Sequence, residues 1–541
     1  MVITLCYDCE PNIDADLILR REHSLMPRPR RILAFCGFVF PAICFAAEST
    51  NDPRDRRPPN ILFLAVDDLR CELGCYGVDA IISPNIDRLA ASAVKFTRAY
   101  CQLAVCNPSR VSVMTGMRPD TTMVWDLRSK FRETIPDAIT MPQHFRQHGY
   151  HAVSFGKIFH NPWPDQVSWD EPHRWPQDAK LWSKESQQRL AEYRQQMRKE
   201  GKNHAQIQRM RAPAIEVSSL SDSEHRDGAI ADQAISALDR LAKLEQPFFL
   251  ATGFVRPHLP FVVPKKYWDL YRREDIRLAT NGYLPKNMPE LAFGSSPQGG
   301  FYELRDYMDF ADAVWPLDGS LTPAQQRELK HGYYAAVSFI DAQIGRLLDK
   351  LDALHLTDDT IVVLWSDHGW KLGEHNGWCK QTNFEIDTRV PLLIRDPRIK
   401  SGGAVSNSLV ELVDLYPTLC ELSGIPSPDF LEGASLAPIL AEPDQTVKTA
   451  AISQFPHRRG RETFMGYSLR TDEFRYTVWI SSTSGAVAAR ELYDHRVDTQ
   501  ENENVADAPQ HAERIEQLDS LLWETIPNPM AEFNALLKSA S

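Results

Sequence analysis

The sequence predicts an α/β protein with a large, mixed but mostly parallel central sheet between helices, and a smaller C-terminal α+β domain. Short runs that are apolar on both faces recur along the chain and alternate with segments of helical spacing, which is the pattern of a sheet covered on both sides. At 541 residues the chain is too long for one small core. Its composition, 43% hydrophobic and 24% charged, is ordinary for a globular protein.

The expected core strands are residues 60–66, 151–155, 247–253, 360–366 and 390–394, because each is a short apolar run bounded by polar or turn residues. The apolar spacing of residues 86–96 and 332–351 predicts helices between them. Together these elements form an expected catalytic domain over residues 60–426.

Two segments interrupt this alternation. Residues 176–226 are polar and rich in Gln, Arg and Lys, which predicts an inserted helix with a solvated face. Residues 283–319 carry many Pro, Gly and aromatic residues and are expected to form a surface loop near the substrate. From residue 427 the pattern changes to short strands at 466–470 and 474–480 and a helix at 512–525, which predicts a smaller domain over residues 427–541.

The N-terminus carries the pattern of a secretory signal peptide. Met26 is followed by the basic stretch 27–31 and by an apolar run that ends in small residues at Ala47. We therefore expect a leader over residues 1–47 with translation starting at Met26, cleavage near Ala47, a linker over 48–59, and a secreted or periplasmic protein. The run is short for a membrane span, so no stable span is expected in the mature chain, although an N-terminal anchor stays open as the alternative.

Charge and cysteine content narrow the class of partner. The formal net charge of −12 argues against nucleic acid, because binding to phosphates requires a concentrated basic surface. Six cysteines follow the leader, too few and too scattered for a disulfide framework, although one or two bridges stay open.

Acidic and titratable residues follow several predicted strands directly. Asp67 and Asp68 come after the strand at 60–66, and Asp367 and His368 follow the strand at 360–366. Functional groups of a parallel sheet gather at the carboxyl ends of its strands. Carboxylate oxygens suit calcium or magnesium, whereas either pair alone could also cap a helix. Cys106 lies on the segment between the two strands, so the sequence predicts a metal site beside a candidate nucleophile.

Cationic groups reach the same edge of the sheet. Lys157 and His160 follow the strand at 151–155, His258 follows the strand at 247–253, and Lys380 comes shortly after Asp367. A lysine can hold an anionic oxygen as a point charge, and a histidine can exchange a proton near neutral pH. The predicted site is therefore suited to an anionic ester.

Cys106 begins the motif Cys-Asn-Pro-Ser-Arg, which ends at Arg110 and is followed by Thr-Gly at residues 115–116. By itself this match leaves open a buried structural cysteine. The other motifs are Val-Asp-Asp-Leu-Arg at 66–70, Gly-Lys-Ile-Phe-His at 156–160, Arg-Pro-His-Leu-Pro-Phe at 256–261, Ser-Asp-His-Gly-Trp at 366–370 and Glu-Leu-Tyr-Asp-His at 491–495. With them, the chain resembles the type I sulfatases of the alkaline phosphatase superfamily, and the iduronate-2-sulfatase branch in particular, over roughly residues 59–507.

This resemblance implies that a maturase converts Cys106 to formylglycine, with Pro108 and Ser109 serving the maturase. It implies one calcium ion, held by Asp67, Asp68, Asp367, His368 and the modified residue 106. Arg110 and His160 would position and deprotonate the formylglycine hydrate. Lys157, His258 and Lys380 would bind sulfate, and His258 or Lys380 would protonate the departing alcohol. Arg256 stands where related enzymes have lysine, and would meet a substrate carboxylate or pair on the surface.

The expected function is therefore hydrolysis of sulfate esters on a sulfated saccharide, for which the resemblance suggests a 2-O-sulfated uronic acid. Two alternatives remain at this point. One is a phosphate or phosphonate ester hydrolase of the same superfamily. The other is a catalytically silent protein that binds sulfated glycans and keeps Cys106 as a thiol.

Overall fold

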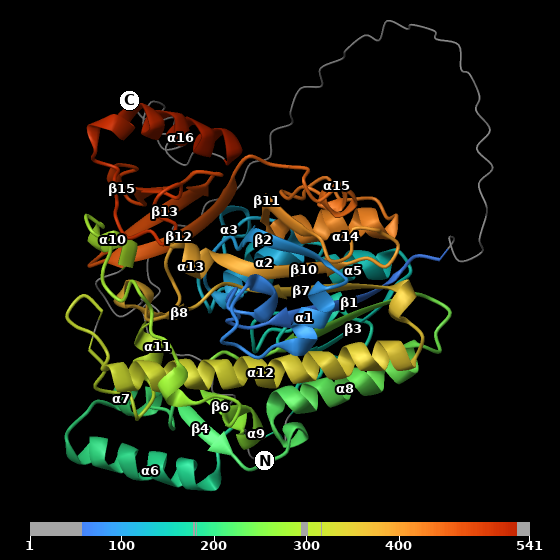
Figure 1. The fold of residues 1–541 in the computed structure, drawn as a ribbon, viewed down its shortest axis with the longest axis horizontal. Helices are drawn as coiled ribbons and strands as arrows, with labels where there is room; N and C mark the ends of the chain where they lie inside the picture. The colour runs from blue at the N-terminus through green and yellow to red at the C-terminus, as the bar shows by residue number, and fades with distance from the viewer. Residues whose placement is uncertain (1–56, 177–178, 180, 294–300, 315, 527–541) are drawn as a thin grey trace, which may run out of the picture.

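A computed structural model describes residues 57–176, 179, 181–293, 301–314 and 316–526. A seven-stranded sheet forms the centre of the molecule, and every strand runs parallel to the others except β10, which is antiparallel to both its neighbours. The mixed, mostly parallel sheet is thus confirmed (Figure 1). In sheet order the strands are β11 (Val405–Glu411), β2 (Val94–Tyr100), β10 (Arg389–Arg395), β7 (Thr360–Ser366), β1 (Asn60–Val66), β5 (Phe248–Phe254) and β3 (His151–Gly156).

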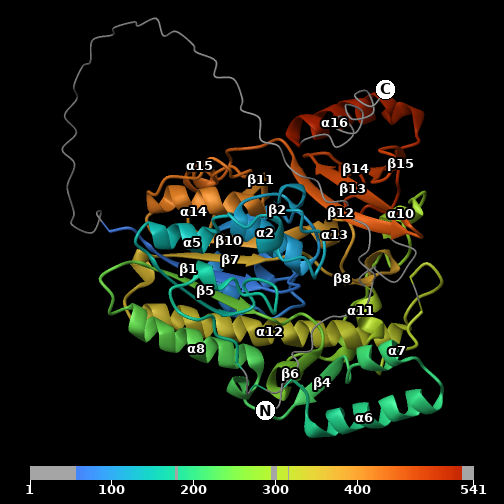
Figure 2. The same cartoon turned by 180° about the vertical axis from the view of Figure 1, so that it is seen from behind.

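Helices cover both faces of this sheet, because its central strands are apolar on both sides. In β1, Leu62 and Leu64 belong to one buried cluster, whereas Ile61 and Phe63 belong to the cluster on the opposite face. Figures 1 and 2 show the two helical layers on either side of the strands. The first layer is α1 (Pro84–Ala90), α8 (Arg226–Leu241) and α12 (Pro323–Ala353), and the second is α2 (Cys106–Thr115), α5 (Met141–Gln147) and α14 (Leu415–Ser423).

The helix expected over residues 86–96 is wrong in its second half, since α1 ends at Ala90 and β2 begins at Val94. Residues 94–97 alternate between apolar and polar, which is the strand period. That alternation differs from the unbroken apolar runs of the predicted strands, and β2 was missed for this reason. β11 was missed because residues 406–408 are all polar.

Both inserted segments contain regular structure. The predicted helix within 176–226 is confirmed as α6 (Lys184–Lys199), which is followed by α7 (His204–Arg209). The segment 283–319, expected as a loop, contains α10 (Glu290–Phe293) and α11 (Phe301–Arg305). The remaining short elements are α3 (Pro119–Thr122), α4 (Phe131–Thr134), α9 (Lys265–Trp268), α13 (Glu385–Thr388), α15 (Ala437–Ala441), β4 (Ile215–Ser218) with β6 (Phe261–Pro264), and β8 (Lys371–Leu372) with β9 (Trp378–Cys379).

A four-stranded antiparallel sheet and a helix form the C-terminal part of the described chain (Figure 1). Glu385 ties this sheet to the central domain, because its carboxylate pairs with Arg475 at 2.6 Å and Arg470 at 3.2 Å. The α+β character is as expected, whereas the boundary at residue 427 stays a prediction. The elements are β12 (Ala451–Arg459), β13 (Glu462–Arg470), β14 (Phe474–Ser481), β15 (Val487–Asp494) and α16 (Ala512–Thr525).

Three other expectations concern the leader, a membrane span and disulfide bridges. The leader over residues 1–47 lies outside the described residues. Across the part that the structure describes, no helix combines the length and apolar character that crossing a bilayer requires. The six cysteines from Cys71 to Cys420 are free rather than bridged.

Glu491 makes the stability of the C-terminal sheet depend on pH. The side chain is buried and accepts hydrogen bonds from Trp479 and Tyr493, yet burial raises its pKa from 4.5 to about 7. Between these two values the folded protein holds a proton that the unfolded chain has released, so this stabilisation is full below pH 4.5 and is lost as the pH rises through 7. We expect Glu491→Gln, which mimics the protonated acid, to raise the thermal unfolding midpoint at pH 8 but not at pH 4.5. The gain at pH 8 is at most about 3 kcal/mol.

Glu473→Gln is the matched control. Glu473 lies beside the same sheet, but its side chain is half exposed and forms a 3.8 Å ion pair with Arg496. Exposed pairs of this kind contribute little, so the control should leave the unfolding midpoint unchanged at both pH values. An equal response of the two variants would contradict the role assigned to Glu491.

Candidate active site

Four of the predicted metal ligands meet at the carboxyl ends of two adjacent strands. β1 and β7 pair in parallel along their whole length, so Asp67 and Asp68 after β1 lie beside Asp367 and His368 after β7. The Asp68 backbone N–H donates to the Asp367 carboxylate at 3.1 Å. All four side chains are fully buried. The sheet therefore brings together three carboxylates and one imidazole that are about 300 residues apart in the chain.

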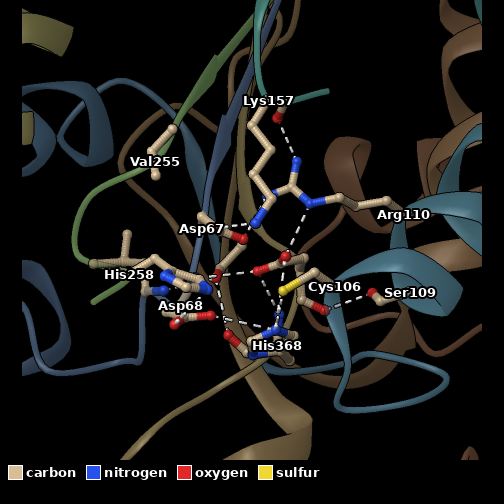
Figure 3. A network of polar contacts seen from close by, with 12 residues as sticks. Asp67, Asp68, Cys106, Ser109, Arg110, Lys157, Val255, His258 and His368 are labelled. Carbon is tan, nitrogen blue, oxygen red and sulfur yellow. Dashed lines mark hydrogen bonds and ion pairs between the residues drawn. The ribbon is translucent and has the colours of Figure 1, made fainter. Parts of the chain in front are cut away.

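Cys106 lies at the first position of α2 and points into this cluster (Figure 3). Its sulfur is 3.4 Å from His368 Nε2 and 3.6 Å from Lys380 Nζ. Burial, and then the negative charge of Asp67, raise the pKa of the Cys106 thiol well above its ordinary value. As a cysteine, this residue would therefore be a neutral thiol at pH 7 and a weak nucleophile.

Arg110 holds two of the acids in place. Its guanidinium is fully buried and lies 2.9 Å from the Asp367 carboxylate and 3.0 Å from that of Asp67. It also donates to the Ile158 carbonyl at 3.1 Å and to the Lys157 carbonyl. In this structure Arg110 is therefore a structural cation of the cluster, and the predicted orientation of a residue-106 hydrate stays a prediction.

Two lysines contact the same acids. Lys157 Nζ lies 2.5 Å from Asp67, and Lys380 Nζ lies 2.7 Å from Asp68. The chain beyond β3 reaches this position because Gly253 has no side chain, since a Cβ there would lie 2.0 Å from the Lys157 carbonyl oxygen. The acids raise the pKa of both lysines above the ordinary value, although burial opposes this effect. Both lysines therefore remain charged at pH 7.

His258 and His160 occupy different surroundings. His258 Nε2 is 4.0 Å from Asp68, within the same cluster. His160 is buried after β3, and its Nδ1 has no hydrogen-bond partner among the described residues. Burial lowers the pKa of both, to about 4 for His258. A neutral His160 at pH 7 has the protonation state of a base, while its predicted contact with the residue-106 hydrate stays a prediction.

Arg256 is buried, with 4% of its surface exposed, so the alternative of a surface ion pair is wrong. Its Nη1 donates to the His258 carbonyl at 2.8 Å, which supports the loop that carries His258. A contact between Arg256 and substrate stays a prediction.

The donor set at the strand ends fits a hard divalent cation. His368 Nδ1 lies 2.9 Å from the Gly369 carbonyl oxygen and therefore carries the proton, so the Nε2 lone pair faces Asp68 at 3.4 Å and Asp367 at 3.7 Å. A lone pair facing carboxylates is unfavourable unless a cation lies between them. Burial and the neighbouring acids also raise the pKa of Asp68 well above its ordinary value. Asp67, Cys106, Asp367 and His368 have ligand atoms within 4.8 Å of one another, and Asp67, Asp68, Cys106 and His258 form an overlapping group.

Two contacts in the site were not foreseen from the sequence. Glu303 of α11 reaches His258 at 3.1 Å and Lys380 at 3.5 Å. Ser109, expected to serve only the maturase, donates its hydroxyl to the Asp367 carbonyl at 2.5 Å and so tethers the loop after β7. A sequence signal for Glu303 is weak, because a single acid in a segment without strand or helix periodicity is far more often exposed than buried.

A mostly parallel sheet with this arrangement at its strand ends defines a hydrolase of the alkaline phosphatase-like fold with a candidate metal centre. A family model described as Sulfatase matches residues 59–425, and one described as N-sulphoglucosamine sulphohydrolase, C-terminal, matches residues 373–527. The chain is 34% identical to iduronate 2-sulfatase of Mus musculus, over 90% of this chain and 98% of the relative. The chain belongs to the sulfatase family, and it is a sulfuric ester hydrolase.

Solved structures agree with the fold. BT4656 in complex with its substrate D-glucosamine-2-N,6-O-disulfate has a TM-score of 0.66 at 22% identity, and covers 87% of this chain and 97% of its own. A phosphonate monoester hydrolase of Agrobacterium radiobacter has a TM-score of 0.64 at 23% identity, over 86% of this chain and 96% of its own. Because one fold carries both activities, the fold alone does not select sulfate. The assignment to the sulfatase family selects sulfate.

Proposed function

We propose that this sulfatase is calcium-dependent, carries formylglycine at position 106, and removes sulfate from a sulfated saccharide. The observation that carries the proposal is the placement of residue 106, whose sulfur lies 3.4 Å from His368 and 3.6 Å from Lys380 inside a ring of buried acids. The nucleophile would thus share one site with the cation ligands and the groups that neutralise sulfate.

The chain's own groups divide the chemistry between them. As a formylglycine hydrate, residue 106 would supply one hydroxyl to attack sulfur, and deprotonation of its second hydroxyl would re-form the aldehyde and release sulfate. Asp67, Asp68, Asp367 and His368 would hold a calcium ion, which would supply positive charge next to these oxygens. His160, neutral at pH 7, is the proposed base for the hydrate. Lys157 and Lys380 neutralise the sulfate oxygens as point charges.

The leaving alcohol needs a proton. As the S–O bond breaks, its electron pair remains on the alcohol oxygen, and an alkoxide is a poor leaving group unless a proton reaches it. His258 and Lys380 contact the same carboxylate, that of Glu303, at 3.1 and 3.5 Å. We assign protonation of the departing oxygen to this pair. Lys380 is charged at pH 7 and can supply the proton, whereas His258 can do so only when its Nε2 is protonated.

The proposed substrate is a 2-O-sulfated uronic acid within a sulfated saccharide. This assignment rests on the likeness to iduronate 2-sulfatase over nearly the whole length of the relative. We further propose export through the segment up to Ala47, giving a secreted or periplasmic enzyme, and conversion of Cys106 by a formylglycine-generating maturase.

Peptide mass spectrometry tests the modification. Trypsin releases residues 99–110, a peptide that contains both Cys101 and Cys106. In protein made in a host with the maturase, we expect residue 106 as the aldehyde or its hydrate, while Cys101 in the same peptide stays a cysteine and serves as the internal control. Finding only cysteine at both positions would leave a silent glycan-binding protein.

The same preparation tests the substrate. Disaccharides that carry one sulfate, at the uronic acid 2-O, glucosamine N or glucosamine 6-O position, separate the possible ester positions. We expect sulfate release from the 2-O-sulfated uronic acid to be fastest. Faster release from a glucosamine sulfate would refute the proposed substrate and keep the sulfatase.

A further inference from the structure

Glu303 is a mostly buried acid that belongs to none of the three groups of possible metal ligands among the described residues, yet it contacts two residues of the candidate active site. It lies on α11, whose position is fixed by Leu304, 1% exposed, and by the fully buried Tyr307 just beyond the helix. Only 15% of the Glu303 side chain is exposed. This segment therefore delivers one carboxylate to the pocket from outside the central sheet.

The two oxygens of Glu303 contact two different groups. Oε1 lies 3.1 Å from His258 Nε2, and Oε2 lies 3.5 Å from Lys380 Nζ. These are the groups assigned above to the leaving alcohol. Glu303 is closer to His258 than Asp68 is, since Asp68 lies 4.0 Å from the same nitrogen.

The direction of the His258 ring follows from a hydrogen bond at Nδ1 and an ion-pair contact at Nε2. Nδ1 lies 2.6 Å from the Leu259 carbonyl oxygen, and a carbonyl only accepts, so Nδ1 carries the proton on that side. Nε2 lies on the side of Glu303, to which it can donate only when the ring is an imidazolium, the form that the Glu303 charge favours. Without Glu303, one of the two contacts that orient the ring would be lost.

We propose that Glu303 is a positioning residue that fixes His258 and Lys380 on the leaving-group side of residue 106. The inference rests on the proposed function, in which this pair protonates the departing oxygen. Proton transfer depends strongly on the placement of the acid. Loss of Glu303 should therefore lower kcat/KM more for an ester with a poor leaving group than for one with a good leaving group.

The leaving-group dependence of Glu303→Gln tests this role. The variant keeps the size of the side chain and removes its charge. We expect kcat/KM to fall by ~10–100-fold for the sulfated disaccharide that the wild type prefers, because its alcohol is a poor leaving group. For 4-nitrophenyl sulfate, whose phenolate leaves readily, we expect a loss below ~3-fold.

Two further variants separate position from charge and from general damage. Glu303→Asp keeps the charge but shortens the side chain, so it should lose nearly as much as Glu303→Gln on the disaccharide. Glu290→Gln is the matched control in the same segment, because Glu290 is 64% exposed and its 3.3 Å ion pair with Arg459 is also exposed. It should match the wild type on both substrates.

Equal losses on the two substrates in Glu303→Gln, or wild-type turnover of the disaccharide by Glu303→Asp, would overturn the positioning role. These outcomes differ from a failure of the proposed function. A wild-type protein that carries formylglycine but releases no sulfate from any of these esters would refute the function itself.

Discussion

Replacing Cys106 with alanine is expected to abolish sulfate release, by a factor on the order of 10⁴ or more in kcat. Alanine cannot be converted to an aldehyde, so the variant has no group at position 106 that could attack sulfur. The fold should persist, because alanine favours the helix that begins at this residue and removes only one buried atom. Sulfate release from 4-nitrophenyl sulfate and from the preferred disaccharide measures the loss, and circular dichroism checks the fold.

Cys101→Ala is the matched control for this variant. Cys101 is equally buried and lies five positions earlier in the same segment, where its sulfur faces the Asp387 carbonyl at 3.9 Å. The Cys101→Ala variant removes the same kind of sulfur atom from the core but leaves the candidate active site intact, so it should retain wild-type turnover. Activity of Cys106→Ala within a few-fold of Cys101→Ala would remove the nucleophile from residue 106.

The fold was predictable where burial alone determines the local pattern. The strands at 60–66 and 360–366 and the helix at 512–525 match β1, β7 and α16 in both bounds. The two strands are continuous apolar runs with polar residues directly after them. β2 and β11 were missed, since β2 alternates between apolar and polar residues over 94–97 and β11 contains three consecutive polar residues, so neither is an unbroken apolar run. A continuous apolar run is an easier signal than a half-buried strand.

The part of the site that lies at the carboxyl ends of the strands was predictable from the sequence. Asp67, Asp68, Asp367 and His368 are brought together by the pairing of β1 with β7, which parallel topology alone implies. Glu303 could not be found in this way, because its place depends on how an inserted segment packs against the sheet. No periodicity encodes that packing.

The structure adds a second role for Arg110. The resemblance implies that it orients the nucleophile, which stays a prediction, and its guanidinium also binds Asp67 and Asp367 at 3.0 and 2.9 Å. Three buried acids are thus matched by Arg110, Lys157 and Lys380. Breaking a buried pair typically costs about 3–5 kcal/mol, so the motif arginine contributes to the integrity of the site as well as to its chemistry.

Removing the proposed calcium ion is expected to suppress turnover and to lower stability together. A chelator would leave the Nε2 lone pair of His368 facing Asp68 and Asp367 at 3.4 and 3.7 Å with no cation between them. A ligand that binds only the folded state stabilises it by about 2.7 kcal/mol at one hundred times its Kd. We therefore expect the chelated protein to unfold at a lower temperature, and both stability and sulfate release to return on adding Ca²⁺. Mg²⁺ should restore less, because it requires a strict octahedral set of oxygens and loses its own water reluctantly.

Two variants locate the ion. Asp367→Asn removes one predicted ligand, and should eliminate the rise in unfolding temperature that Ca²⁺ produces. Glu501→Gln removes an equally buried acid from the other group that could hold a metal, formed with Glu385 and His495. There Arg475 already pairs with Glu501 at 2.6 Å and with Glu385 at 2.6 Å, so the calcium response should be unchanged. If chelation alters neither activity nor stability, or if only Glu501→Gln loses the response, the cation does not lie beside residue 106.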